Sequence, residues 1–370
     1  MGAIFQNFSN LTWQQAVMWA IGALLIYLAI KKDMEPALLL PMGFGAILVN
    51  IPLSGAITQG LEIGVLDVLF QGGIANELFP LLLFIGIGAM IDFEPLLTNP
   101  KLMLFGAAAQ FGIFFTLVVA SLLGFPLKDA ASIAIIGAAD GPTSIFVANY
   151  LGSNYIGPII IAAYSYMSLV PIVQPPIIKL LTSKKERRIR MEYTGSSVSK
   201  TTKILFPIIV TVIAGLFAPR SVALVGFLMF GNLIRECGVL NSLSQTAQNA
   251  LANLITLLLG LTVAANMQAA SFLTLKTLMI IGLGLVAFVF DTVGGVLFGK
   301  IINLFVKKKV NPMIGAAGIS AFPMASRVIH KMGLAEDKQN FLLMHAAGAN
   351  VAGQIASVLA GGMLLNLIVK

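Results

Sequence analysis

Long apolar runs separated by short polar segments recur along the whole chain. Most of these runs approach the roughly 20 residues that an α-helix needs to cross about 30 Å of hydrocarbon. They predict membrane-crossing helices near 14–30, 36–53, 79–97, 101–124, 155–181, 202–218, 221–237, 247–265, 276–304 and 340–366. The pattern therefore predicts an all-α polytopic membrane protein with a single transmembrane domain, 1–370, and no sizeable soluble domain.

The composition agrees with this class. Hydrophobic residues make up 58% of the 370 residues and charged residues only 10%, whereas about a quarter of a soluble domain is charged. Residues 1–13 are polar and do not resemble a cleavable signal peptide. A single cysteine, Cys237, excludes an internal disulfide, and with only two histidines we expect no structural zinc site.

The distribution of Lys and Arg predicts the orientation. The basic segments 31–32, 184–190 ("KKERRIR") and 307–309 ("KKK") are expected on the cytoplasmic side. The connection 54–78 contains acidic residues but no Lys or Arg, and is expected outside.

This orientation leaves two apolar segments that cannot cross. Segment 127–151 has to enter and leave on the outer face, and segment 310–332 on the cytoplasmic face. Both contain the tetrapeptide Ile-Gly-Ala-Ala, at 136–139 and at 314–317, followed by a small or polar break. Two interrupted helices of opposite orientation indicate inverted repeats around a transport site at mid-membrane, although small residues also serve plain helix packing.

We therefore expect an inverted-repeat, transporter-like bundle with two opposed re-entrant helical hairpins. The first repeat spans about 14–181 and contains hairpin 127–151. The second spans about 202–366 and contains hairpin 310–332. A basic cytoplasmic loop, 182–201, joins them.

The stretch "IGAADGPTSIF" (136–146) places a carboxylate inside the first hairpin. Pro142 fits the first turn of a helix and disfavours helical geometry at the residue before it. One half-helix is thus expected to end near Ala139 and another to start at Pro142. Freed backbone carbonyls, the Asp140 carboxylate and the hydroxyls of Thr143 and Ser144 would form an oxygen-only set suited to a hard cation, for which sodium is preferred. A plain helix-capping role for Asp140 is the alternative, and it is compatible with ion binding.

Other polar residues in apolar surroundings are further candidates. Tyr164 and Tyr166 lie within the predicted span 155–181, where packing is the usual role of a tyrosine. Asp291 lies halfway along 276–304 and is either a cation ligand, a proton carrier or a buried hydrogen-bonded partner. Asn311 is expected to cap the first half-helix of the second hairpin. Arg327 is either a topology charge or a bidentate clamp for a substrate carboxylate.

Several long peptides resemble one known family, and together they cover nearly the whole chain. They are "GAADGPTSIFVANYLG", "AAYSYMSLVPIVQPPIIKLLTSKKERRIRM", "FGNLIRECG", "FDTVGGVLFGK" and "NPMIGAAGISAFPMASRV". They resemble the membrane β-subunit of the biotin-dependent, sodium-pumping decarboxylases, whose complexes act on oxaloacetate, methylmalonyl-CoA, glutaconyl-CoA or malonate. The resemblance implies a subunit that decarboxylates carboxybiotin, exports sodium ions and consumes a proton from outside.

The resemblance also implies site residues and partners. It places the sodium and proton residues at Asp140, Tyr166, Asn311, Gly315, Ser320 and Arg327. The catalytic set is then Asp140, Tyr166 and Arg327, with Arg327 contacting carboxybiotin. The sodium ligands are then Asp140, Asn311, Gly315 and Ser320, and from the residues alone we add Thr143 and Asp291.

The implied cofactors are sodium and a biotin supplied by a separate carrier, because this chain has no Met-Lys-Met biotin-attachment motif. The implied partners are a biotin carrier protein, a carboxyltransferase subunit and a small membrane-anchored accessory subunit, in a homo-oligomer without nucleic acid. The implied location is the bacterial or archaeal cytoplasmic membrane. A sodium-coupled secondary transporter of a small carboxylate, without enzymatic activity, is the alternative from another class.

Overall fold

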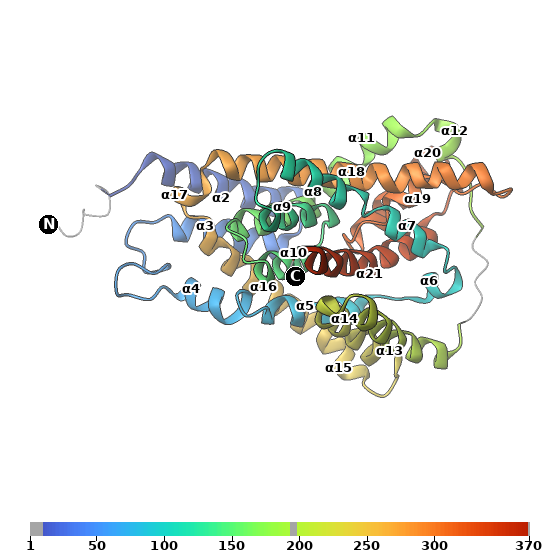
Figure 1. Ribbon diagram of the computed structural model, residues 1–370, viewed down its shortest axis with the longest axis horizontal. Coiled ribbons are helices and arrows are strands. Elements are labelled where there is room, and N and C mark those ends of the chain that lie inside the picture. Colours follow the sequence, from blue (N-terminus) through green and yellow to red (C-terminus); the bar gives the residue numbers. More distant parts are fainter. Residues whose placement is uncertain (1–9, 193–197, 369–370) are drawn as a thin grey trace.

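The computed structural model describes residues 10–192 and 198–368, which form an elongated bundle of helices (Figure 1). The first half of the chain contains α2 (Trp13–Lys32), α3 (Pro36–Val49), α4 (Val65–Leu69), α5 (Leu78–Met90), α6 (Glu94–Thr98), α7 (Leu102–Ala108), α8 (Phe111–Leu122), α9 (Leu127–Ala134), α10 (Gly141–Tyr150) and α11 (Ile156–Leu181). After α12 (Lys184–Arg187), the second half contains α13 (Lys200–Phe217), α14 (Val222–Glu236), α15 (Asn241–Thr246), α16 (Ala252–Val263), α17 (Ala269–Phe272), α18 (Leu275–Phe305), α19 (Met313–Ala316), α20 (Met324–Glu336) and α21 (Leu343–Ile368). The β-structure in these residues is limited to one isolated antiparallel bridge, between Gln59 and Glu62. The predicted all-α class is confirmed.

Seven helical stretches in the described residues are long and apolar enough to cross a membrane, or eight if the bent pair 65–74 and 78–90 counts as one span. Ten spans were expected from the sequence. The difference arises partly at α3 and α14, which have 14 and 15 residues and are therefore only about 21–23 Å long. The number of stretches that meet the length criterion still indicates a multi-pass membrane protein.

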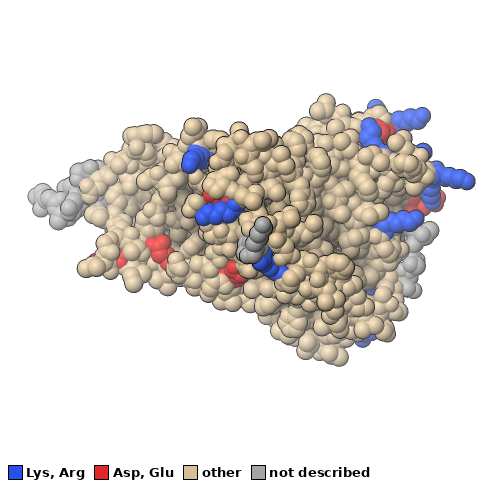
Figure 2. Space-filling view, in the orientation of Figure 1, with Lys and Arg blue, Asp and Glu red and all other residues tan. Residues whose placement is uncertain are grey.

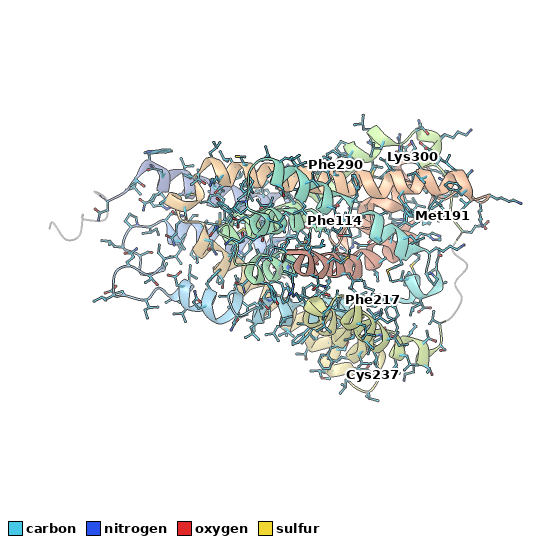
Figure 3. The ribbon with its side chains drawn as sticks, viewed as in Figure 1. Phe114, Met191, Phe217, Cys237, Phe290 and Lys300 are labelled. Atoms are coloured by element: carbon cyan, nitrogen blue, oxygen red, sulfur yellow. The ribbon has the colours of Figure 1, made fainter. Side chains whose placement is uncertain are left out.

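The helices differ greatly in how much of their surface the protein covers. Only 11% of the α13 window is buried, and its Leu216 and Phe217 are 77% and 81% exposed. Phe217 is labelled in the lower part of the view in Figure 3. By contrast, 72% of the α21 window is buried, and Figure 1 shows α21 in the middle of the molecule, beside α10. Polar residues on α21 are therefore enclosed by protein, whereas α13 has its apolar side chains on the outside.

Basic residues gather at one end of the long axis (Figure 2). Lys300 and Met191 are labelled toward this end in Figure 3, and the Lys300 ammonium donates to the Leu181 carbonyl at 3.0 Å. The first described residues and α4 lie at the opposite end (Figure 1). The region around Lys300 and the connection that contains α4 therefore lie toward opposite ends of the bundle.

Segment 127–151 folds back on itself. Its chain runs through α9, a 3₁₀ turn at Ile135–Ala138, and then α10. The Lys128 ammonium donates to the Gly152 carbonyl at 2.9 Å, and the Ser153 hydroxyl donates to Asp129 at 2.8 Å. These bonds tie the beginning of the segment to the residues that follow its end.

Segment 310–332 is anchored in a similar way. The side-chain amides of Asn311 and Asn340 both donate to the Arg187 carbonyl, at 3.0 and 2.9 Å. Arg187 also forms an ion pair with Glu336 at 2.6 Å. The beginning of this segment and the residues beyond its end therefore meet at the basic loop.

The bases of the two segments lie at opposite ends of α18. At one end, the Lys276 ammonium lies 5.8 Å from the centre of the Tyr155 ring, just beyond the base of the first segment. At the other end, the Asn303 amide donates to the Val310 carbonyl at 2.7 Å, at the base of the second. Since α18 has 31 residues and is about 46 Å long, the two segments enter the bundle from opposite ends.

Candidate functional site

The first segment is interrupted at Ala139 and Asp140. Ala139 has φ +51°, in the left-handed region, and Asp140 has an extended backbone as the N-cap of α10. Pro142 follows within the first turn of α10, where its missing N–H costs no helical hydrogen bond. The predicted break and restart of the helix are confirmed to within one residue.

The Asp140 carboxylate is buried and surrounded by hydroxyls. One oxygen, Oδ2, accepts from the Thr143 hydroxyl at 2.5 Å and from the Ser357 hydroxyl at 3.1 Å. The other, Oδ1, accepts from the Thr143 N–H at 3.3 Å. Asp140 is 3% exposed, and none of the ion pairs between described residues includes it. Asp140 therefore caps α10 and at the same time forms a buried oxygen cluster without a cationic side chain.

The second segment is interrupted between Ala316 and Met324. Here carboxamide side chains from three elements bind the freed backbone carbonyls. The pairs are Gln174 with Ala316 (2.7 Å), Gln110 with Gly318 (3.4 Å), Asn350 with Ile319 (2.7 Å) and Gln354 with Ser320. Because each NH₂ faces a carbonyl, the orientation of each amide is fixed. The side-chain oxygens of all four have no hydrogen-bond partner among the described residues and are buried.

The two breaks touch each other. The Ser320 N–H donates to the Ala138 carbonyl at 3.0 Å, and the Ser320 hydroxyl donates to the Gly353 carbonyl at 2.9 Å. One turn further along α21, Ser357 reaches Asp140. Helix α21 thus connects the second break to the carboxylate of the first, and brings Asp140, Thr143 and Ser320 into one region.

The contribution of α21 to the site is not among the residues predicted from the sequence. Asn350, Gln354 and Ser357 are spaced by four and three residues, so they share one helix face within an otherwise apolar span. This polar stripe in "NVAGQIAS" was visible in the sequence. Single buried amides such as Gln110 and Gln174 carried no comparable signal, because nothing in their local sequence shows which carbonyls they bind.

Asn311 and Gly315, which the resemblance assigns to sodium, each have contacts with the surrounding protein. The Asn311 amide donates to carbonyls of the basic loop, and its oxygen accepts from the Met313 N–H at 3.1 Å. Gly315 lies against α18, where a Cβ would be 1.8 Å from the Gly295 carbonyl oxygen. In this structure Asn311 anchors the base of the second segment and Gly315 permits backbone-to-backbone packing.

Asp291 binds the start of a helix. It is fully buried in α18, and its Oδ1 accepts from the N–H groups of Gly112 and Ile113, the latter at 3.2 Å. These are the first residues of α8 after its break from α7. Its other oxygen, Oδ2, is buried without a hydrogen-bond partner among the described residues. Asp291 therefore has a hydrogen-bonded role through Oδ1, and its role as a cation ligand or proton carrier stays a prediction.

Tyr166 and Arg327 lie on different helices and face different partners. The Tyr166 hydroxyl donates to the Ile281 carbonyl on α18, and its ring stacks on Phe288. Arg327 is exposed on α20. Burial raises the pKa of Glu35, in the connection between α2 and α3, and the positive charge of nearby Arg327 partly opposes this shift. None of the ion pairs between described residues includes Arg327.

Comparisons with known proteins agree over nearly the whole chain. Residues 14–368 match the family model described as the Na⁺-transporting oxaloacetate decarboxylase beta subunit. The chain is 51% identical to the glutaconyl-CoA decarboxylase subunit beta of Acidaminococcus fermentans, over 98% of this chain and 95% of the relative.

Two further relatives carry other names. The chain is 48% identical to the methylmalonyl-CoA decarboxylase subunit beta of Propionigenium modestum, over 98% of this chain and 96% of the relative. It is 44% identical to the oxaloacetate decarboxylase beta chain of Klebsiella pneumoniae, over 96% and 95%. The relatives are thus named for three different acyl substrates.

Proposed function

The chain belongs to the family of Na⁺-transporting oxaloacetate decarboxylase β-subunits, and on this premise we propose that it decarboxylates carboxybiotin and uses the reaction to export sodium ions. The biotin is carried by a separate protein. The names of the relatives support a division of the reaction between two subunits. The named substrates differ, although each relative is 44–51% identical to this chain. A partner carboxyltransferase subunit then selects the acyl substrate, and this chain performs the step common to all.

The two folded-back segments are proposed to be re-entrant hairpins of inverted repeats, 14–181 and 202–366. Three observations support this proposal. The segments enter from opposite ends of α18, their breaks touch, and the Ile-Gly-Ala-Ala tetrapeptides end at or next to each break. Interrupted helices in corresponding places of two repeats are typical of transport sites at mid-membrane.

The transported sodium ion is proposed to bind at Asp140. The carboxylate and the hydroxyls of Thr143 and Ser357 are hard oxygen ligands of the kind that such a cation prefers. Ser320 holds the second break against the first, close to this cluster. Asn311 and Gly315 support the site by fixing the second segment in place. The single observation that carries the proposal is the buried Asp140 carboxylate, which has no cationic side-chain partner among the described residues, at the contact of the two breaks.

Coupling follows from the chemistry of that carboxylate. Decarboxylation consumes a proton, which is proposed to pass inward through Tyr166 and Asp140. A protonated carboxyl is a poor cation ligand, so arrival of the proton at Asp140 releases sodium. Exporting one net charge against 100 mV costs about 2.3 kcal/mol, and decarboxylation has to supply this free energy. Coupling therefore requires that decarboxylation does not proceed while the site is empty of sodium.

Arg327 is proposed to orient the incoming carboxylate. Its guanidinium offers bidentate donors, it is exposed, and none of the ion pairs between described residues includes it. The basic loop that carries Arg188 lies at the same end and would attract an acidic carrier protein. The complex is further proposed to include a small membrane-anchored accessory subunit, to be a homo-oligomer and to reside in a bacterial or archaeal cytoplasmic membrane.

The test compares Asp140→Asn with Asp129→Asn in the assembled complex. Asp129 is a matched control, because it is a buried carboxylate of the same segment, 1% exposed, whose partners lie at the base. Asp140→Asn keeps an N-cap but loses the charge and the titratable proton. We expect it to lose at least about tenfold in sodium-activated decarboxylation, equivalent to about 1.4 kcal/mol, and to lose sodium uptake into inverted vesicles.

Two results would contradict the proposal. Near wild-type pumping by Asp140→Asn would reduce Asp140 to a helix cap. Sodium-coupled carboxylate uptake by the wild type without any decarboxylation would instead support the secondary transporter.

A further inference from the structure

Tyr164 carries a buried hydroxyl that the proposed mechanism does not use. The side chain is 2% exposed, and its hydroxyl has no hydrogen-bond partner among the described residues. A buried hydroxyl without a hydrogen-bond partner is energetically unfavourable. Tyr166, two residues further along α11, points to another side and donates to the Ile281 carbonyl. Packing alone therefore does not explain why a tyrosine, with its hydroxyl, stands at position 164.

The Tyr164 ring lies against the break in the first segment. A Cβ placed on Gly141 would be 2.2 Å from both Cε1 and Cζ of the ring. Because Cζ bears the hydroxyl, the phenolic oxygen lies close to the backbone that joins Gly141 to Asp140.

The Asp140 carboxylate has capacity to share with this hydroxyl. Its Oδ2 already accepts from two hydroxyls, at Thr143 and Ser357. Its Oδ1 accepts only one N–H, at 3.3 Å, whereas a carboxylate oxygen has two lone-pair sites. The unpaired phenol and the less occupied carboxylate oxygen thus belong to one small region around the break.

We propose that the Tyr164 hydroxyl is a further neutral oxygen ligand of the sodium site at Asp140. A phenolic oxygen has the lone pairs that a hard cation needs, and the ion would supply the partner that the hydroxyl lacks. This inference rests on the proposed sodium site and adds one ligand, from α11, to those of α10 and α21. It also assigns different tasks to the two tyrosines, since Tyr166 is bound to α18.

The test is Tyr164→Phe in the assembled complex. Removing an unpaired buried hydroxyl should leave the unfolding temperature unchanged or raise it, because no hydrogen bond is lost. The sodium concentration for half-maximal decarboxylation should rise at least about tenfold, with the rate at saturating sodium largely kept. Tyr150→Phe is the matched control, since Tyr150 is 44% exposed on α10, and it should leave the sodium requirement unchanged.

A second readout does not depend on activity. Sodium should raise the unfolding temperature of the wild type, because a ligand that binds only the folded state stabilises it. This increase should need at least about tenfold more sodium in Tyr164→Phe.

The inference is overturned if Tyr164→Phe keeps or lowers the sodium requirement in both readouts. If the wild type itself shows neither sodium-activated decarboxylation nor sodium-induced stabilisation, the proposed function fails instead.

Discussion

The Ser320 N–H donates to the Ala138 carbonyl at 3.0 Å, and this bond joins the two broken segments of the chain. The carbonyl belongs to the last residue of the 3₁₀ turn before the first break, and the donor belongs to the second break. A carbonyl freed from a helix at membrane depth needs such a partner. Each break therefore helps to satisfy the backbone of the other, and movement of one segment alone would leave a buried carbonyl unpaired.

The first prediction concerns the membrane topology of the two segments. In a Cys237→Ser background, cysteines placed at Leu127 and Gly152 should both react with a membrane-impermeant reagent from outside. The reason is that the bonds from Lys128 and Ser153 hold the two ends of that segment together. Labelling is measured in intact cells and in inverted vesicles.

Cysteines at Val310 and Lys331 are the reciprocal pair and should react only from the cytoplasmic side. If the two ends of either segment react from opposite faces, that segment is an ordinary span and the inverted-repeat proposal is wrong.

The second prediction concerns Asp291. Since its carboxylate accepts from the first N–H groups of α8, Asp291→Asn should keep this cap and leave the sodium requirement within about twofold of the wild type. Asp291→Leu should lower the free energy of unfolding by about 1–3 kcal/mol, because buried N–H groups lose their acceptor. Thermal unfolding and sodium titration of decarboxylation measure the two effects. A large rise in the sodium requirement of the Asn variant would instead support Asp291 as a ligand.

The third prediction concerns the contact between α18 and α19. A Cβ at Gly295 would be 2.1 Å from the Gly315 carbonyl oxygen, so the backbones have to separate in Gly295→Ala. We expect this overpacking to lower the free energy of unfolding by about 1–3 kcal/mol. A Cβ at Gly282, in the same helix, would have no neighbouring atom within 4 Å. Gly282→Ala should therefore leave the free energy of unfolding unchanged or raise it. Equal unfolding temperatures for the two variants would show that the helices adjust without cost.

The fourth prediction concerns the pH dependence of the basic loop. A hydrogen bond from Arg190, with another from the Gln339 N–H, holds the pKa of Asp337 below its ordinary value of 3.8. A depressed folded-state pKa means that the carboxylate stabilises the folded loop above about pH 4, and that this contribution is lost as the pH falls through the still lower folded-state pKa. The contact of Arg190 with Asp337 should therefore not change between about pH 5 and 8 and should loosen in acid.

Amide hydrogen exchange of residues 184–190, corrected for the intrinsic pH dependence of exchange, measures this. Asp337→Asn should weaken the acid transition. A transition between pH 5 and 8 would point to another group.

The sequence predicted the first break well because the signals there are local. Proline, glycine and a capping carboxylate act on the two or three residues beside them, so the roles of Ala139, Asp140 and Pro142 could be assigned from the sequence alone. The basic segments are likewise readable one by one. The length of helices such as α3 was less predictable, because an apolar run does not show where a turn will end it.

The environment of the second break was beyond sequence reasoning for a different reason. Its carbonyls are bound by Gln110 and Gln174, which lie more than 100 residues away in the chain. No local pattern reports such a pairing. The residue type of Asn311 was also ambiguous. An asparagine suits both a cation site and a backbone anchor, and the sequence alone does not distinguish these two roles.

The four carboxamides around the second break give the two halves of the site unequal chemistry. A carboxamide neither gains nor loses a proton in the range of pH that cells experience. The hydrogen bonds from these side chains to the backbone carbonyls within 316–320 therefore do not depend on pH in that range. The first break instead contains Asp140, whose charge depends on protonation. The second break thus has side-chain partners that do not titrate, whereas the first break has one that does, so a proton that arrives at the contact of the two breaks changes the charge of the first break alone.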